Sequence, residues 1–217
     1  MRALGAKKSE PSLGVCESKF GGIPYAEDED FGPYSFLGQL DLTHATRALP
    51  SAARLRGLLR IDIANSADFT QLARGVWFPE AHPERAVRCP AESTGNWETR
   101  LTFEPRWCLP EGKQLDSIWP LDVPTDEFGE CILPPYAAQD DPHQLLGHRS
   151  SALDDSYGFD PPAGLSDDIN DYEQLHRLTF DNPAGFHWGS NVLYLLVPRR
   201  DLDAGDLRRV VCTAANY

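Results

Sequence analysis

The stretch Tyr34–Leu42, which reads YSFLGQLDL, decides how the first part of this chain folds. Its aromatic and aliphatic residues are typical of a β-strand. Upstream, Gly21-Gly22 and Pro24 predict a tight turn, because glycine and proline favour the backbone angles that turns require. The acidic run Glu27–Asp30 is then expected in the loop between this turn and the strand.

A second strand is predicted within Leu55–Ala64, which reads LRGLLRIDIA. Polarity alternates along part of this run, and side chains two positions apart share one face of a strand. We therefore predict a half-buried strand with Arg60 and Asp62 on its polar face. The apolar face carries Leu59, Ile61 and Ile63.

Short runs of strand-forming residues continue along the chain, separated by irregular loops, and long helices are not indicated between residues 65 and 135. LGQLDL followed by GLLRIDI is laid out like LHRLTF followed by VLYLLVP, which suggests a diverged internal duplication. The further predicted strands or turns are Val76–Phe78, Glu98–Phe103, Gln114–Trp119, Tyr172–Phe180, Asn191–Val197 and a last element at Asp206–Cys212.

Composition points to one globular domain. The chain has a mass of 24.1 kDa and is 41% hydrophobic with five Trp, which is enough material for a core. Its first residues, MRALGAKKSEPSLG, contain no apolar run of the kind a secretory signal needs, and no stretch reaches membrane-spanning length. We expect a flexible lead-in over residues 1–17, a single domain over 18–217 and a cytoplasmic location.

The net charge of −13 argues against nucleic acid or an anionic membrane as partner and allows a basic one. From Asp140 to Glu173 there are nine acidic residues and one basic residue, Arg149, so this stretch carries nine minus one, or eight, net negative charges. Aromatic residues within it could supply apolar anchors for a partner. The candidate partner-binding residues are Asp140, Asp141, Asp154, Asp155, Tyr157, Phe159, Asp160, Asp167, Asp168, Asp171 and Glu173.

Two other interpretations of this acidic stretch stay open. It could be a solvated loop that keeps the protein soluble. Its oxygen-rich segments DDSYGFD and DDINDYE could also bind calcium, although neither has the spacing of an EF-hand loop.

Motifs for catalysis or cofactor binding are absent from the sequence. His143 and His148 are five residues apart, so neither a helix nor a strand would place them on one face. Ser190 lacks a nucleophile elbow, and Gly21-Gly22 does not open a phosphate-binding helix. We predict no catalytic residue, no metal and no cofactor. The five cysteines have no CxxC spacing and are expected to be reduced; they are Cys16, Cys89, Cys108, Cys131 and Cys212.

Short segments occur in a fixed order along the chain, among them SKFGGIP at Ser18–Pro24, FLGQLDL at Phe36–Leu42 and HQLLG at His143–Gly147. In this order they resemble the YwqG-like family of bacterial proteins, over the chain from about residue 18 to about 212. Two positions depart from that family's pattern, since WGD reads WGS at Trp188–Ser190 and GG-x-P reads GHRS at Gly147–Ser150. A ligand site formed there in relatives is therefore in doubt here. The resemblance implies a compact, strand-rich α+β fold with two similar halves, and no reaction. The matching segments are Ser18–Pro24, Phe36–Leu42, Leu49-Pro50, Gly57–Leu59, His143–Gly147, Trp188-Gly189, Leu193-Tyr194 and Asp201-Leu202.

Members of this family often lie beside genes for secreted toxins, which implies that some are immunity proteins. We therefore hypothesise that this chain neutralises a basic toxin, with a nuclease as the expected class, because clustered carboxylates speed association with a basic surface. An unrelated intracellular adaptor is a further possibility. The alternative is a small-molecule-binding protein or enzyme with a pocket between the two halves, whose candidate residues would be His143, His148, His176, His187 and Trp188.

Overall fold

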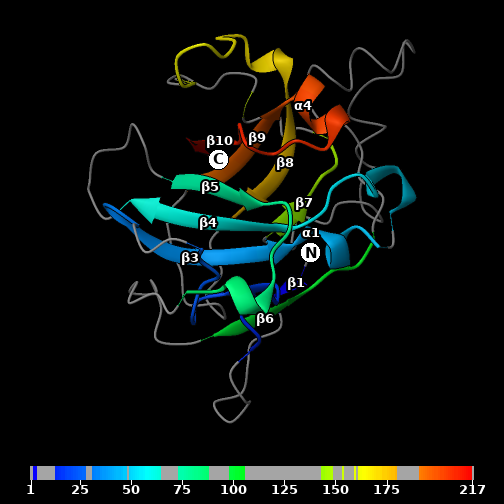
Figure 1. The fold of residues 1–217 in the computed structure, drawn as a ribbon. Helices are drawn as coiled ribbons and strands as arrows, with labels where there is room; N and C mark the ends of the chain where they lie inside the picture. Colours follow the sequence, from blue (N-terminus) through cyan, green and yellow to red (C-terminus); the bar gives the residue numbers. More distant parts are fainter. Residues whose placement is uncertain are drawn as a thin grey trace, which may run out of the picture.

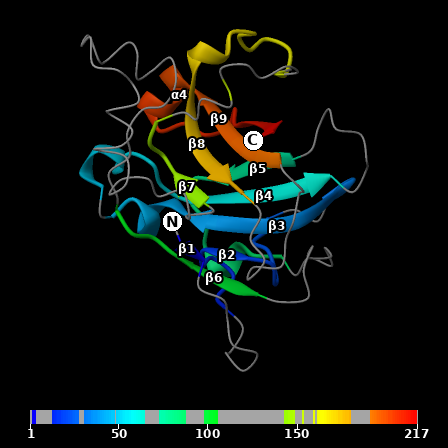
Figure 2. The ribbon, with the colours of Figure 1, turned by 180° about the vertical axis from the view of Figure 1, so that it is seen from behind.

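Antiparallel strands form most of the regular structure of this protein. The computed structural model describes residues 2–3, 13–27, 31–47, 49–64, 73–87, 98–105, 143–148, 153, 159, 161–179 and 191–216. Within these residues lie ten strands in two antiparallel sheets, together with a few short helices. Figures 1 and 2 show the two sheets packed against each other, with α4 and β8–β10 on one side and β1–β6 on the other.

The first sheet has six strands in the order β1-β6-β2-β3-β4-β5. Its long central strands pair over most of their length, from Tyr34 opposite Ala64 to Asp41 opposite Leu58. A β-bulge interrupts this register between Phe36 and Gly38. The strands are β1 (Arg2–Ala3), β2 (Lys19–Phe20), β3 (Tyr34–Asp41), β4 (Leu58–Ala64), β5 (Ala73–Phe78) and β6 (Thr99–Thr102).

The second sheet has four strands in the order β10-β9-β8-β7. A β-bulge also interrupts the β8–β9 register, between Gln174 and His176. The strands are β7 (His143–Leu145), β8 (Tyr172–Leu178), β9 (Asn191–Pro198) and β10 (Val211–Asn216). The short helices are α1 (Leu42–Ala45), α4 (Arg199–Ala204) and three 3-10 turns at Pro50–Ala52, Pro83–Arg85 and Ile169–Asp171.

The main core lies between the inner faces of the two sheets. Alternate residues of each strand point into it, as the period of a strand requires. Leu40 and Leu59 enter from the first sheet, and Leu178 and Leu195 enter from the second. Phe20 of β2 lies against His143 of β7, with ring centroids 5.0 Å apart, so the two sheets touch directly there.

The prediction that β4 is half-buried was wrong, because Arg60 and Asp62 are as buried as the apolar residues between them. Asp62 lies between two guanidinium groups, with Arg60 Nε 3.0 Å from Oδ1 and Arg74 Nε 3.0 Å from Oδ2. The Arg60 guanidinium also lies 4.1 Å from the centroid of the Phe31 ring and donates to the Tyr25 carbonyl oxygen. The chain before β3 thus covers this face of the sheet, which a local pattern does not reveal.

The other predicted strands can be compared with the structure element by element. Tyr34–Leu42 is confirmed as β3, and strands are also confirmed at the positions of β5, β6, β8 and β9. The last element was placed too early, since β10 begins at Val211. The preceding residues form a turn in which the Asp206 amide donates to the Asp201 carbonyl oxygen at the end of α4. Gln114–Trp119 and Asp28–Asp30 of the acidic run lie outside the described residues.

The strand pairs that suggested a duplication, β3–β4 and β8–β9, are both antiparallel with a bulge in the first strand. This local likeness is compatible with many strand pairs, so the two similar halves stay a prediction. Among the described residues, no helix is both long enough and apolar enough to cross a membrane.

Gly57 provides a test of this packing, because its φ of +82° is left-handed and a Cβ would lie 2.2 Å from the Phe78 carbonyl oxygen. Gly164 has a similar φ of +88° with nothing within 4 Å, so it isolates the backbone strain. We expect Gly57→Ala to lower the free energy of unfolding by roughly 3 kcal/mol or more, and Gly164→Ala by about 1 kcal/mol. Urea denaturation measures both, and equal losses would contradict the close approach.

Candidate functional site

The outer face of the second sheet is covered by an acidic segment of the chain. We call residues 159 and 161–173 the acidic cover. Its apolar side chains, from Phe159, Leu165 and Ile169, pack on a second core made by the outer faces of β8, β9 and β10. That core contains Leu153, Tyr172, Val192, Tyr194, Leu196 and Val211. The cover is therefore amphipathic and is attached to the sheet by its apolar residues.

Asp168 and Asp171 of the cover are exposed, and local hydrogen bonds hold their carboxylates in place. Asp168 caps the 3-10 turn Ile169–Asp171, because its Oδ1 accepts from both the backbone and the side-chain nitrogen of Asn170, each at 2.8 Å. Ser166 Oγ donates to Asp171 Oδ2 at 2.5 Å. Tyr172 donates from its hydroxyl to the Ser166 carbonyl oxygen at 2.8 Å. These bonds fix the direction of the acidic side chains before any partner arrives.

Arginine residues from the C-terminal part of the chain lie beside these carboxylates. Glu173 pairs with Arg199 at 3.0 Å. Burial raises the pKa of Tyr172, Asp167 and Asp171 raise it further, and two nearby arginines lower it. Three carboxylates of the cover, at residues 167, 171 and 173, thus share their surroundings with three guanidinium groups. Those three belong to Arg199, Arg200 and Arg209.

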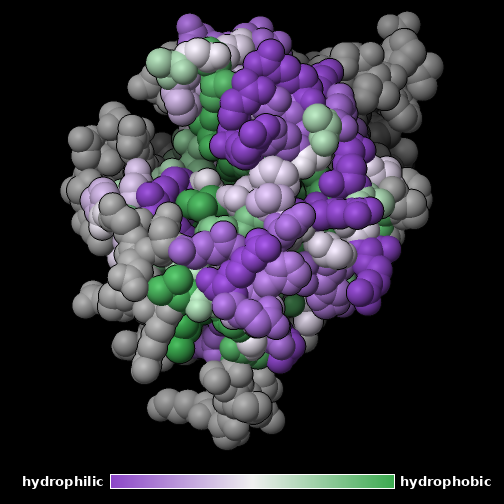
Figure 3. All heavy atoms as spheres, viewed as in Figure 1, coloured by the Kyte–Doolittle hydropathy of each residue, from purple (hydrophilic) through white to green (hydrophobic). Residues whose placement is uncertain are grey.

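This arrangement reduces the local charge below what the sequence count suggested. Hydrophilic residues gather over α4 in Figure 3, where Arg199 and Arg200 begin the helix. Arg209 also pairs with the buried carboxylate of Asp201. The remaining predicted partner-binding residues lie outside the described residues; they are Asp140, Asp141, Asp154, Asp155, Tyr157 and Asp160.

The sequence suggested that Phe159 is an exposed anchor for a partner, but the structure places it in a different environment. Its ring is half-buried and meets the Tyr172 ring nearly edge-on, at 5.0 Å between centroids and 79° between planes. It belongs to the packing of the second core. Only part of the ring is left for contact with another protein.

The histidines are not arranged as an accessible pocket in the described part of the chain. His143 and His176 are fully buried on the inner face of the second sheet, whereas His148 is exposed. Burial, aided by the neighbouring His143, lowers the pKa of His176 to about 3, so its imidazole is neutral at physiological pH. His187 and Trp188 lie outside the described residues. No group of three potential metal ligands occurs among the residues that the structure describes.

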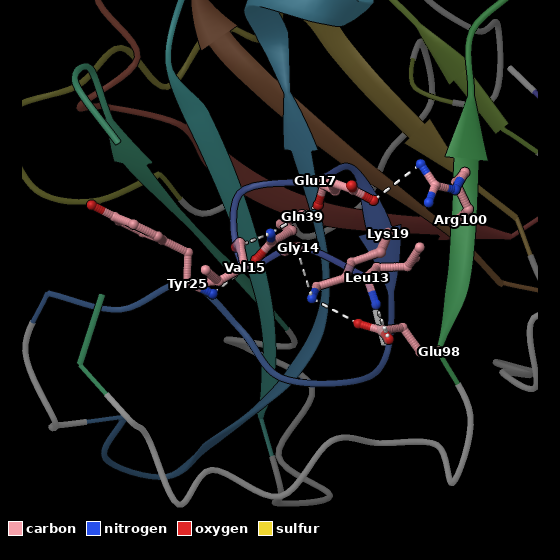
Figure 4. Close-up of polar contacts among 9 residues, drawn as sticks. All are labelled: Leu13, Gly14, Val15, Glu17, Lys19, Tyr25, Gln39, Glu98 and Arg100. Carbon is pink, nitrogen blue, oxygen red and sulfur yellow. Dashed lines mark hydrogen bonds and ion pairs between the residues drawn. The ribbon is translucent and has the colours of Figure 1, made fainter. Parts of the chain in front are cut away.

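A buried polar network lies on the outer face of the first sheet, around Lys19 of β2 and Gln39 of β3 (Figure 4). Gln39 of β3 is fully buried, accepts from the Tyr25 amide at 2.9 Å, and donates to the Val15 and Glu17 carbonyl oxygens at 2.7 and 2.9 Å. Residues 13–17, which the sequence placed in the lead-in, are thereby held against the sheet. The residues of this network therefore have a structural role, because they hold residues 13–17 against the first sheet.

The sequence analysis missed the ion pair at the centre of this network. Lys19 Nζ lies 2.7 Å from Glu98 Oε1, and Glu98 Oε2 accepts from the Leu13 amide at 2.8 Å. The Lys19 side chain is 0% exposed and that of Glu98 is 18% exposed. No signal in the sequence links two charged residues that lie so far apart along the chain.

No family model matches the chain, and no curated protein matches it.

We expect replacement of Lys19 and replacement of Glu98 to lower the free energy of unfolding by different amounts. Glu98→Ala leaves a fully buried ammonium group without its carboxylate, so we expect it to cost about 3 kcal/mol of unfolding free energy. Lys19→Met leaves a carboxylate that water still reaches, and we expect about 1 kcal/mol. In a Lys19→Met background, Glu98→Ala should cost less than it does alone. Urea denaturation of the four proteins tests this, and simple additivity of the two losses would rule out the pair.

Phe159 can be tested as a core residue against an exposed apolar control. We expect Phe159→Ala to lower the free energy of unfolding by about 2 kcal/mol, because it removes a half-buried ring from the second core. Ile23 is 60% exposed, so Ile23→Ala should change stability by less than about 0.5 kcal/mol. Thermal and urea denaturation provide the comparison. Equal stability of the two variants would indicate that Phe159 is not a core residue and is instead a free surface anchor.

Proposed function

We propose that this protein is an immunity protein that binds a basic, secreted bacterial toxin domain, with a nuclease as the expected class, and blocks its substrate-binding surface. One structural observation carries the proposal. The acidic cover presents exposed carboxylates in fixed positions while its apolar residues are occupied in the second core. A solvated loop that served solubility alone would need neither the caps nor the packing.

The charge of the protein supports a basic partner. A net charge of −13 attracts a basic domain over distances comparable to the Debye length, about 8 Å at physiological ionic strength. Nuclease sites are positively charged to hold phosphates, so fixed carboxylates can occupy the same positions. The arginines beside the cover add selectivity, because a partner must also offer groups that tolerate Arg199 and Arg200.

The resemblance to the YwqG-like family belongs to this proposal, as do the two similar halves and the cytoplasmic location. The family resemblance supplies the link to toxin genes, which the charges alone do not supply. The second candidate was a small-molecule site or enzyme with a pocket between the halves. Burial of His143 and His176 inside the core gives that candidate no accessible imidazole pair, so we favour a binding protein without catalytic residues or cofactors.

The test starts from the gene beside this one, which we expect to encode a secreted protein with a basic C-terminal domain. That domain is purified and mixed with this protein. We expect a stoichiometric complex whose association rate falls steeply with added salt. Replacing Asp167, Asp168 and Asp171 with Lys should slow association by about tenfold or more, because steering charges act mainly on the on-rate.

Two controls keep the result interpretable. Changing the same three aspartates to Asn retains hydrogen-bonding side chains and removes only charge, so it should have an intermediate effect on the on-rate. Glu80→Gln with Glu84→Gln removes exposed charge beyond β5 of the first sheet and should leave association within about twofold. An unchanged on-rate in the Lys variant would show that the acidic cover is not part of the interface. If no complex forms at all, the immunity function is rejected.

A further inference from the structure

The edge strand β7 is the smallest element of the second sheet and is attached by few contacts. It has three residues, which pair with Arg177, Leu178 and His176 of β8. After it, the Leu146 amide donates to the Leu175 carbonyl oxygen at 2.9 Å. Such short edge strands are the parts of a sheet that open most easily.

Two imidazoles lie where β7 and β8 meet the first sheet. His143 and His176 point to the same inner face, because His143 is opposite Leu178 and His176 is opposite Leu145. His143 stacks against Phe20 of β2, with ring centroids 5.0 Å apart. The β7–β8 edge therefore rests on the first sheet through one of these two rings.

The hydrogen bonds of His176 define its neutral form. Its Nδ1 is 2.9 Å from the Gln144 carbonyl oxygen, which can only accept, so Nδ1 carries the proton. Its Nε2 is buried and has no hydrogen-bond partner among the residues that the structure describes. A second proton on Nε2 would place an unpaired charged donor among the apolar side chains of Leu145, Leu178 and Leu195.

Positive charge near His176 opposes its protonation. Arg177, beside it on β8, lowers its pKa, as would a proton on His143 of β7. Leu195, opposite His176 on β9, is uncharged. The Gln144 carbonyl favours the charged form but does not outweigh burial, which lowers the pKa of His176 to about 3.

We propose that His176 is an acid-operated latch: its neutral ring lets β7 and the facing half of β8 close against the first sheet, where His143 meets Phe20, and its protonation releases this edge. An opened edge hydrates both rings and returns His176 to the ordinary pKa of about 6.5. Because the pKa is lower in the closed form, the open form binds more protons. Closure is therefore favoured at neutral pH, and this contribution is lost as the pH falls from about 6.5 towards 3.

The first sheet is expected to stay closed under the same conditions. The β3–β4 pair is long and carries its own share of the main core, so its amides should need global unfolding to exchange. The latch thus predicts a local opening at one edge, distinct from ordinary acid denaturation of the whole domain.

Hydrogen exchange followed by mass spectrometry tests the latch on the full chain between pH 7.5 and 4.5, after correction for intrinsic exchange rates. In peptides that cover β7 and β8, we expect the opening constant to rise about 100-fold by pH 4.5, two units below the pKa of the open state. Peptides from β3 and β4 should remain protected.

Variants of His176 test whether its ring causes the rise of the opening constant at low pH. His176→Leu and His176→Gln should reduce the rise to within about threefold, whereas His148→Gln, which removes an exposed imidazole from the same segment, should keep it. A full rise in either His176 variant overturns the latch. Should neither His176 variant fold, wild-type protein decides alone: parallel loss of protection in β3–β4 and β7–β8 overturns the latch, and loss confined to β7–β8 supports it.

Discussion

The packing of two inner sheet faces on each other is the constraint on which the rest of this structure depends. The main core draws residues from both sheets, so neither sheet can form its inner face without the other. Close approach is required where the sheets meet: a Cβ on Gly75 of β5 would lie 2.8 Å from Cγ1 of Val210, which immediately precedes β10. The Phe20–His143 contact closes another side of the core. Both sheets then still have an outer face to cover.

The two outer faces are covered by different chemistry. On the first sheet, the face carries Lys19, Gln39 and Arg60, and their side chains bind largely backbone groups of the segments that lie over them. On the second sheet, the face is apolar, and the cover is held by Phe159 and Ile169. Since apolar groups hold the second cover, its carboxylates are free to face solvent, which is why we place the partner surface there.

This difference in chemistry between the two sheets also explains where motion is expected. The ion pair between the buried Asp62 of β4 and Arg74 of β5 links two neighbouring strands of the first sheet, so it resists local opening. The β7–β8 edge carries the buried imidazole of His176, whose pKa is lowered by burial. The cover and the edge strand therefore offer two independent responses, one to a charged partner and one to acidity.

The sequence by itself determined the class of fold and most strand positions, because alternation in runs such as Tyr34–Leu42 is a local property. It also located the acidic cover, since net charge is read directly from residue identity. Only the tertiary structure decided which polar residues are buried and what surrounds each charge. Arg60 and Asp62 look solvent-facing until Tyr25 and Phe31 contact the Arg60 guanidinium and bury this face. The cover looks strongly negative until Arg199 and Arg209 lie near it. Burial and pairing depend on contacts between segments far apart in the chain, and no local pattern encodes those contacts.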